Sequence, residues 1–382
     1  MKKFLILGDG IVSHLVANVL SNFGHKSFIL KSIGTKKLSK SNRYFSLNIL
    51  SKYFLSLMEF WPLDKNIIPY SKIKTWDNET HKKLNFDSHD ISFDNFGFVV
   101  NESELIDKII TKSKKNKNIS YLNNIEEESR DGIIRILDQK KITDIDYIIS
   151  TIKNHDLVLN RIKFDEINYN QEALVTNVKL ENSDNHTAYQ KFSKSCIYGL
   201  LPLGNSNYNL IISADFDKIN DLKSQNKTKF LNTIRHDLQN DLFSVNKVFS
   251  HTPFPLSGYK ARQHYVDNIL MMGGAAHSIH PLAGMGLNMG IQEAFILYEL
   301  LQRADGHMDD KLLISCDYEF RKFNNEVYYA VNFLKEFYTN KTFPNHIKKI
   351  SLEIFDNLEF IKTKVIMKAS GVSTLKSFNL IR

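Results

Sequence analysis

Cysteine is nearly absent from this chain of 382 residues, which contains only Cys196 and Cys316. Two cysteines give neither a disulfide framework nor a set of metal ligands, and such sparse use fits the cytoplasm. The sequence also lacks a run of about 18 apolar residues, so no helix is predicted to span a membrane. The apolar start Met1–Leu7 stops at Gly8, far short of the apolar core of a signal peptide, so a strand is the better interpretation.

Two further absences reduce the range of possible functions. No basic run is interleaved with aromatic residues, which argues against nucleic acid as a partner, whereas the net charge of +8 suits an anionic membrane surface or an acidic partner. No catalytic triad is recognisable, so the sequence nominates no catalytic side chain. His277 and His280 lack a carboxylate or cysteine partner nearby in the sequence, which favours a structural or cofactor-adjacent role over a metal site.

The most informative segment present is Gly273–Ala294, GGAAHSIHPLAGMGLNMGIQEA, which follows the short apolar run Asn268–Met272 and leads into a helical pattern. A strand, a glycine-rich turn and a helix in this order aim backbone N–H groups and a helix N-terminus at an electron-rich ligand. Gly284, Gly286 and Gly290 let the backbone approach such a ligand closely. One such turn alone would be a weak signal, because glycine-rich patterns also occur in loops that merely pack.

A second glycine-rich turn strengthens that interpretation. The strand Met1–Leu7 is followed by the turn Gly8–Ser13, a helical pattern and a second strand, Lys26–Leu30, which is the opening unit of a dinucleotide-binding fold. Gly8 would make the turn, Gly10 would admit a pyrophosphate, and Ser13 stands where a third glycine is usual. Lys31 fills the position, about 20 residues on, where an acidic residue usually holds the ribose.

The order of these parts resembles the flavin-dependent aromatic hydroxylases of ubiquinone biosynthesis, within the para-hydroxybenzoate-hydroxylase-like superfamily. The resemblance covers nearly the whole chain, and Gly273–Ala294 is its most specific match; the other similar segments are Arg43–Leu47, Leu57–Trp61, Asn95–Val100, Gln171–Val175, Gly199–Leu203 and Met367–Gly371. It implies an α/β fold with a Rossmann-like FAD-binding domain, an interleaved antiparallel-sheet substrate domain and C-terminal helices.

The resemblance also implies FAD as the cofactor, bound without a covalent link between the two glycine turns. Arg43 is a candidate for the pyrophosphate or the flavin edge, the alternative being a solvated loop arginine. The residues expected to bind FAD are Gly8, Gly10, Ser13, Arg43, Gly273, Gly274, Pro281, Gly284, Met285, Gly286, Leu287 and Asn288.

Three departures from the family concern acidic side chains that normally hold the flavin. Lys31, Lys153 and Gly274 occupy the positions where the family has acidic residues. A charge-assisted hydrogen bond contributes about 1.5–3 kcal/mol, so we expect FAD to bind more weakly than is usual in the family. The same departures motivate an alternative function, a non-catalytic homologue that serves as a lipid-binding or scaffold subunit of a quinone-biosynthesis complex.

The function implied by the resemblance is hydroxylation of the aromatic ring of a polyprenyl phenol in ubiquinone biosynthesis, by a monooxygenase that uses O2. The electron donor would be NAD(P)H or a reductase, and subunits of a quinone-biosynthesis complex are expected partners. A hydroxylase of soluble aromatics fits less well, because both ends of the chain match the ubiquinone branch. The expected location is cytoplasmic, with peripheral contact at the inner membrane through the C-terminal segments Phe333–Tyr338, Ile347–Ile350 and Phe360–Met367, which combine apolar residues with lysines. Ordinary packing of amphipathic helices on the core is the alternative there.

The domains are expected to interleave along the chain. The FAD-binding domain would comprise residues 1–71, 95–164 and 261–305, the substrate domain residues 72–94 and 165–260, and the C-terminal helical region residues 306–382. Within the substrate domain, alternating patterns predict strands at Lys72–Trp76 and Asp90–Phe93. A single helix is predicted between Leu222 and Leu242.

Overall fold

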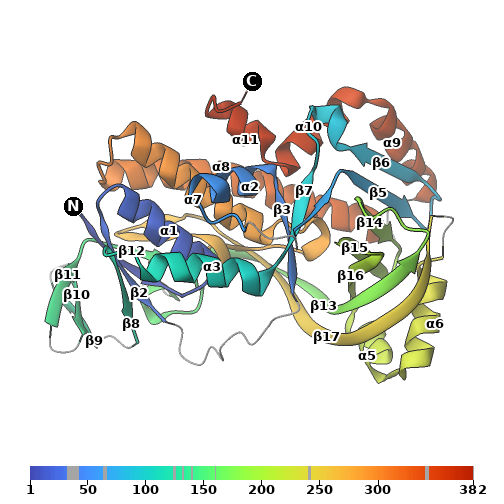
Figure 1. Cartoon of the computed structure of the whole chain (residues 1–382), viewed down its shortest axis with the longest axis horizontal. Helices are drawn as coiled ribbons and strands as arrows, with labels where there is room; N and C mark the ends of the chain where they lie inside the picture. Colours follow the sequence, from blue (N-terminus) through green and yellow to red (C-terminus); the bar gives the residue numbers. More distant parts are fainter. Residues whose placement is uncertain are drawn as a thin grey trace.

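Figure 1 shows the structure, a computed structural model of the whole chain. It describes residues 1–31, 43–62, 67–123, 126–130, 133–138, 141–159, 161–239, 242–339 and 344–381. Two large sheets organise these residues, and each carries helices of its own.

The first sheet has six strands in the order β18 (Tyr265–Val266), β19 (Ile269–Met271), β12 (Tyr147–Ser150), β1 (Lys3–Leu7), β2 (Lys26–Leu30) and β8 (Ile119–Leu122). All neighbours are parallel except β18 and β19. Strand β1 is buried on both faces, as parallel strands usually are. Because side chains alternate along a strand, Phe4 and Ile6 face one layer while Leu5 and Leu7 face the other.

The layer over Phe4 and Ile6 is helical. It contains α1 (Ile11–Asn22), α3 (Glu102–Lys114) and α7 (Gly286–Arg303), and α2 (Ile49–Leu57) packs against α7. The opposite layer contains α4 (Asp156–Leu159) and a small sheet of β11 (Lys141–Ile145), β10 (Ile133–Asp138) and β9 (Glu126–Arg130). Parallel strands with helices on one face and the connection β1–α1–β2 give the arrangement expected of a dinucleotide-binding fold.

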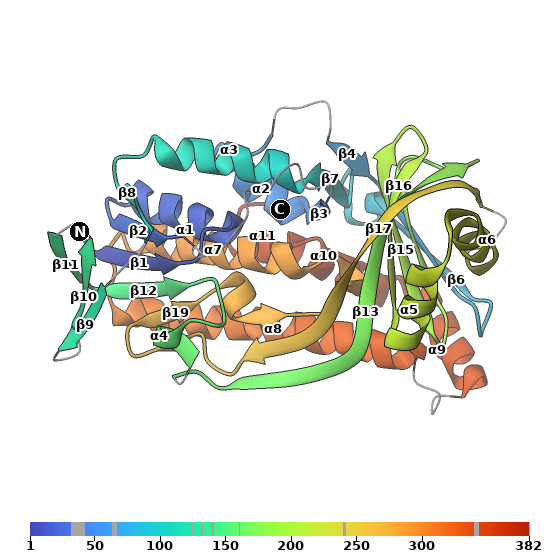
Figure 2. The ribbon, with the colours of Figure 1, turned by 90° about the horizontal axis from the view of Figure 1, so that it is seen from below.

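The second sheet has eight strands in the order β20 (His277–Ser278), β17 (Ser244–Ala261), β13 (Phe164–Glu181), β16 (Asn207–Asp215), β15 (Cys196–Gly204), β14 (Thr187–Phe192), β5 (Lys72–Asp77) and β6 (Lys83–Asp87). It is antiparallel except for the pair β14 and β5. Helices α5 (Phe216–Ser224) and α6 (Lys227–Asp237) cover one face. Figure 2 shows the long strands β13 and β17 curving from beneath the first sheet into the second.

A small sheet and the C-terminal helices complete the described part of the chain. The sheet consists of β3 (Tyr44–Asn48), β7 (Gly97–Asn101) and β4 (Ile68–Tyr70). The C-terminal helices are α8 (Asp310–Thr339), α9 (Asn345–Asn357), α10 (Glu359–Ala369) and α11 (Val372–Ser377), and the 3-10 turns are η1 (Ser88–Ile91), η2 (Gly273–Ala275) and η3 (Pro281–Ala283). None of the helices in the ranges given above is long and apolar enough to cross a bilayer.

Of three local expectations from the sequence, one is wrong and two are confirmed. The strand expected at Asp90–Phe93 is instead the turn η1, because the Asp87 carboxylate accepts the His89 N–H at 3.1 Å and starts a 3-10 helix there. The single helix expected between Leu222 and Leu242 is confirmed as α6, which the Asn226 side chain caps by accepting the Lys229 N–H; the preceding helix α5 was not predicted. The strand expected at Lys72–Trp76 is confirmed as β5.

Candidate functional site

The turn after β1 is built around Gly8. Its φ of +107° is a conformation that side-chain-bearing residues rarely adopt, and a Cβ there would lie 2.5 Å from Thr151 Oγ1. The same hydroxyl is hydrogen-bonded to Ser13 Oγ at 2.7 Å and donates to the Leu7 carbonyl at 3.1 Å. The ends of β1 and β12 and the start of α1 are therefore held together within one turn.

The N-terminus of α1 is open. Gly10 is its N-cap residue, in extended conformation, and no side-chain cap bonds the first turn among the described residues. A Cβ built on Gly10 meets nothing within 4 Å. The first N–H groups of a helix have no partner within the helix and carry its positive end, so this opening suits a phosphate or another anion.

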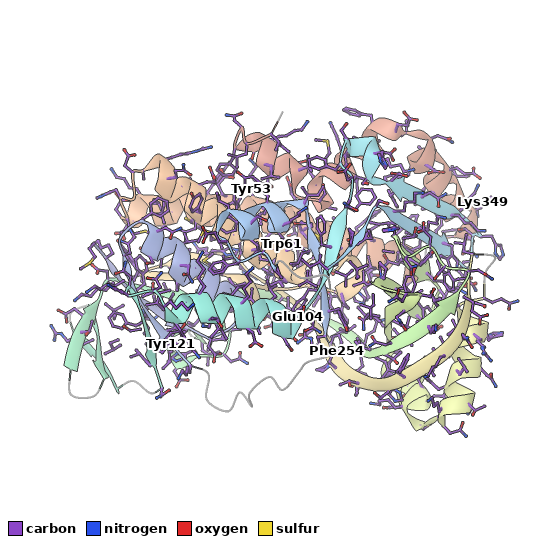
Figure 3. The ribbon with its side chains drawn as sticks, in the orientation of Figure 1. Tyr53, Trp61, Glu104, Tyr121, Phe254 and Lys349 are labelled. Atoms are coloured by element: carbon purple, nitrogen blue, oxygen red, sulfur yellow. The ribbon has the colours of Figure 1, made fainter. Side chains whose placement is uncertain are left out.

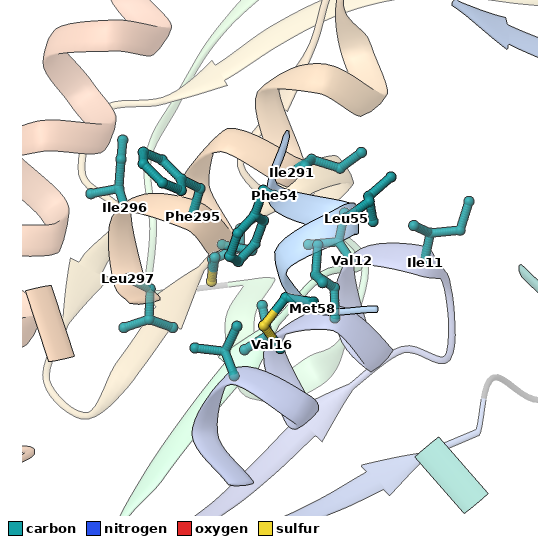
Figure 4. Packing of buried hydrophobic residues seen from close by; sticks show 14 of the residues in the cluster. Ile11, Val12, Val16, Phe54, Leu55, Met58, Ile291, Phe295, Ile296 and Leu297 are labelled. Atoms are coloured by element: carbon teal, nitrogen blue, oxygen red, sulfur yellow. The ribbon is translucent and has the colours of Figure 1, made fainter. Parts of the chain in front are cut away.

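The second glycine turn lies directly beside α1. Gly273 has a φ of +55°, and its Cβ position would be 3.2 Å from Val12 Cγ2. A Cβ on Gly290, in α7, would come within 2.7 Å of the same Val12 atom and 3.2 Å of Gly273 Cα. Figure 4 shows the buried residues of α1, α2 and α7 meeting in one cluster around Val12. Gly273 and Gly290 therefore allow two helices and a turn to approach one another more closely than larger residues would permit.

The loop between η3 and α7 presents a second open helix N-terminus. Gly284 has a φ of +58°, Met285 caps α7 without a side-chain hydrogen bond, and a Cβ on Gly286 meets nothing within 4 Å. The loop is held from behind by Asn288. Its side chain accepts the Asn48 N–H at 2.9 Å and the Ser51 hydroxyl at 2.7 Å, and donates to the Ser46 and Gly284 carbonyls.

The predicted site residues fall into two groups in the structure. Gly8, Gly10, Ser13 and the glycine turn at 273–274 lie around the start of α1, and Pro281, Gly284, Met285, Gly286, Leu287 and Asn288 form the loop that leads into α7. Since the Asn288 side chain is buried and bonded to β3 and α2, only the backbone of this residue is left for a ligand. The Ser13 hydroxyl is likewise bonded to Thr151, and its contact with FAD stays a prediction.

The charged side chains of Lys31, Arg43 and Lys153 each have a partner within the protein. Arg43 is 67% exposed, lies 3.5 Å from a Glu102 carboxylate oxygen and stacks over Phe45. Lys31 donates to Asn123, and Lys153 pairs with Glu166 while its ammonium lies over the Tyr259 ring. The Tyr259 hydroxyl also donates to the Gly274 carbonyl, so Lys153 is linked through Tyr259 to the second glycine turn. The expected contact of Arg43 with FAD stays a prediction.

The arrangement fits an extended dinucleotide with a diphosphate. Two uncapped helix N-termini, α1 and α7, approach each other through Gly273 and Gly290, and each opens into free space at a glycine, Gly10 or Gly286. Backbone N–H groups, which need no particular side chain, would hold most of the ligand. Such a cradle suits FAD, which supplies two-electron redox chemistry when bound.

Sequence reasoning missed three residues that shape this cradle. Thr151 touches both Gly8 and Ser13, and the fully buried Glu293 accepts the Gly273 N–H at 2.6 Å. Asn324 of α8 donates to the same Glu293 carboxylate. The helical pattern that follows Gly286 contained a signal for Glu293, since a carboxylate on the apolar face of a helix needs a partner.

Comparison with known proteins agrees with the geometry. A family model described as "FAD binding domain" matches residues 157–329. Ubiquinone hydroxylase UbiM of Neisseria meningitidis is 27% identical over 55% of this chain and 47% of that protein, so the match spans about half the length of that relative. The mitochondrial ubiquinone biosynthesis monooxygenase COQ6 of Xenopus tropicalis is 24% identical over 96% of this chain and 92% of its own length.

Solved structures with little sequence identity share the fold. The p-nitrophenol 4-monooxygenase PnpA of Pseudomonas putida has a TM-score of 0.72 at 14% identity, covering 97% of this chain and 99% of that one. HpxO of Klebsiella pneumoniae, solved in complex with FAD, has a TM-score of 0.71 at 10% identity, covering 100% and 99%.

Fold, cradle and comparisons together define an FAD-dependent aromatic monooxygenase. Within that class, the chain is similar in sequence to the FAD-dependent hydroxylases of ubiquinone biosynthesis. The fold predicted from the resemblance and the cofactor FAD are thereby confirmed.

A carboxylate restored at Gly274 should tighten FAD binding. Gly274 is exposed, and a Cβ there would lie 3.5 Å from the Thr151 carbonyl oxygen, which is ordinary contact, so a side chain is tolerated. If a charge-assisted hydrogen bond to the cofactor forms, Gly274→Asp should lower the Kd for FAD about tenfold in a fluorescence titration. Gly274→Asn has the same size without the charge and should gain less. Equal affinities of both variants and the wild type would show that no anchor is missing at this position.

Proposed function

We propose that the protein hydroxylates the aromatic ring of a polyprenylated phenol during ubiquinone synthesis. The observation that carries the proposal is the pair of open helix N-termini at Gly10 and Gly286, in a chain whose relatives named for ubiquinone biosynthesis align along nearly its whole length. One atom of O2 would enter the ring and the other would leave as water, with two electrons from NAD(P)H or a reductase.

The chain itself would bind, orient and shield the reactants. The N–H groups at the start of α7 would stabilise negative charge that develops on the reduced cofactor. Apolar side chains packed beneath the loop would limit the access of water. The bound cofactor would supply the redox chemistry, so this function does not require a catalytic triad. The lack of an obvious catalytic side chain in the sequence is therefore compatible with it.

The substrate would lie against the eight-stranded sheet, on the face turned toward η3. Along β15 the side chains alternate, so that Leu200 packs under α5 and α6 while Leu201 and Leu203 pack toward the cofactor-side core. Gln190 of β14 donates to the Leu282 carbonyl at 2.9 Å and joins this face to the cofactor loop. An apolar sheet face beside the loop suits a phenol ring with a prenyl tail.

The non-catalytic alternative is not favoured. It depended on the loss of acidic anchors at Lys31, Lys153 and Gly274, yet both helix N-termini that would hold FAD through their backbones are intact. Deleting the gene in its host tests the proposal. We expect ubiquinone to fall and an under-hydroxylated prenyl phenol to accumulate in the lipid extract, measured by mass spectrometry. Unchanged ubiquinone would contradict both the enzymatic and the scaffold function.

The C-terminal helices carry a surface suited to the membrane where such a substrate is dissolved. Lys348 and Leu352 anchor α9, and the Lys348 ammonium donates to the Tyr338 carbonyl at 3.1 Å. The opposite side of α9 therefore exposes Ile347, Ile350 and Ile354, at helical spacing. On α10, Phe360 is 70% exposed with the Lys364 ammonium 4.1 Å from its ring centroid.

This apolar surface with lysines would bury its isoleucines in the lipid boundary and place its ammonium groups near anionic headgroups. Figure 3 places Lys349 of α9 at the outer edge of the molecule. We expect the wild-type chain to float with anionic vesicles in a density gradient, and the double variant Ile350→Ser, Phe360→Ser to lose most of that binding. Ile314→Ser, an exposed apolar residue on α8, is the matched control. Failure of the wild type to float would leave ordinary helix packing as the explanation.

A further inference from the structure

A buried carboxylate joins the two halves of the cofactor cradle. Glu293, in the second turn of α7, has no exposed surface. Its Oε2 accepts the Gly273 N–H at 2.6 Å, and its Oε1 accepts Asn324 Nδ2 at 2.6 Å. His277 Nε2 also lies 3.1 Å from Oε1, without the alignment of a hydrogen bond. Four elements, α7, η2, β20 and α8, therefore meet at one side chain.

The groups around Glu293 are themselves held in place. His264 accepts from Asn324 Nδ2 at 3.2 Å through Nε2, which fixes its other nitrogen, Nδ1, as the donor to the Met271 carbonyl at 3.0 Å. The backbone N–H of His264 donates to the Asp317 carboxylate, which forms an ion pair with Arg321 on α8. Asp317 thus accepts from the segment that leads into the glycine turn, and Glu293 accepts from the turn itself.

The electrostatics keep Glu293 charged despite its burial. Burial alone would raise the pKa of the Glu293 carboxyl, but the neighbouring His277 and the Gly273 N–H outweigh it and hold the pKa below its usual range. Burial lowers the pKa of His264, opposed by the Glu293 carboxylate. A buried carboxylate whose two oxygens each accept a hydrogen bond is held rigidly, because losing either bond would leave one charged oxygen unsatisfied.

We propose that Glu293 is a positioning residue for FAD, which fixes the Gly273–Gly274 turn against α7 so that both glycine segments present their backbone to the cofactor together. This chain depends on such a joint more than a chain with acidic anchors would, because Lys31, Lys153 and Gly274 leave the backbone to do the binding. A backbone cradle binds tightly only if its N–H groups are held in register. The proposal rests on FAD binding at this cradle and not on the identity of the substrate.

Glu293→Gln tests the proposal with nearly unchanged side-chain volume. The amide has one oxygen for the two sets of donors, so its NH2 group must face either the Gly273 N–H or Asn324 Nδ2. We expect the Kd for FAD to rise at least tenfold and amide hydrogen exchange at residues 273–276 to accelerate in the apoprotein. Glu299→Gln is the matched control, a buried glutamate on the same helix that does not contact the turn. It should change neither measurement.

A rescue separates positioning from general loss of structure. In Glu293→Gln, Asn324→Asp the carboxylate is moved to α8, where it can accept from the new side-chain amide on α7 and again face His277. We expect this double variant to recover much of the lost FAD affinity, whether or not the single variant folds well. Wild-type affinity and exchange in Glu293→Gln, equal weakening by Glu299→Gln, or no recovery in the double variant would each overturn the proposal. All these readouts need only FAD, so they are independent of the proposed hydroxylation.

Discussion

Gly10→Val should lower the affinity for FAD at least a hundredfold while leaving the apoprotein as stable as the wild type. Gly10 is in extended conformation with φ −82° and ψ −174°, which valine also adopts, and its Cβ position has nothing within 4 Å. The fold therefore does not resist the side chain. The valine would, however, stand in front of the open N-terminus of α1 and exclude the pyrophosphate.

A hundredfold loss corresponds to about 2.7 kcal/mol, which is the contribution of one or two charge-assisted hydrogen bonds at about 1.5–3 kcal/mol each. FAD fluorescence titration gives the affinity and calorimetry of the apoprotein gives the thermal midpoint. Gly10→Ala adds only a methyl group at the same position and should weaken binding much less. Wild-type FAD affinity in Gly10→Val would show that the cofactor does not lie at α1.

Gly286→Glu should fail to restore ubiquinone in a strain that lacks the gene. Gly286 is the first residue of α7, and the space beside it is free of protein atoms within 4 Å. A glutamate there would occupy the seat of the cofactor and place a negative charge at the helix end meant for a ligand. We expect ubiquinone no higher than in the deletion strain, measured in lipid extracts.

The same strain distinguishes an enzyme from a scaffold. Gly286→Ala is the matched control and should restore most of the ubiquinone, and immunoblots must show equal amounts of all variants. A scaffold subunit needs the fold but not the cofactor. Full restoration by Gly286→Glu would therefore assign the protein a structural role in the complex.

The sequence alone located the parts of the cradle that depend on local chemistry. Gly8 could be recognised because a turn that needs a positive φ follows an apolar strand, and the structure has φ +107° there. The alternating pattern of Lys72–Trp76 was sufficient to predict β5. Such features depend on neighbours within a few residues, which a pattern can reveal.

What the sequence could not reveal depends on partners far apart in the chain. Thr151 and Ser13 are separated by 138 positions, yet their hydroxyls lie 2.7 Å apart and shape the first turn. Glu293 and Asn324 come from different helices. The parallel pairing of β14 and β5 joins segments more than a hundred residues apart. Only three-dimensional packing brings these residues together, so no local pattern identifies them.

The domain boundaries at residues 71, 94, 164, 260 and 305 stay a prediction. Two long strands explain why the expected domains interleave along the chain. The 18-residue strands β13 and β17 pair with each other along most of their length and run from beneath the first sheet into the second, of which they are part. β20, from the glycine segment itself, pairs with β17 through His277 and Lys260. The glycine-rich segment Gly273–Ala294 is thus hydrogen-bonded through β20 to the sheet against which we place the substrate.

Isotope incorporation from labelled O2 tests FAD-dependent ring hydroxylation most directly. The purified protein is loaded with FAD, supplied with a reductant and a short-chain prenyl phenol, and incubated under heavy-oxygen O2, and the product is analysed by mass spectrometry. We expect one heavy oxygen atom in each product molecule, on the ring, and no labelled product from Gly10→Val. Product oxygen derived from water, or equal labelling with Gly10→Val, would contradict a monooxygenase whose cofactor lies between α1 and α7.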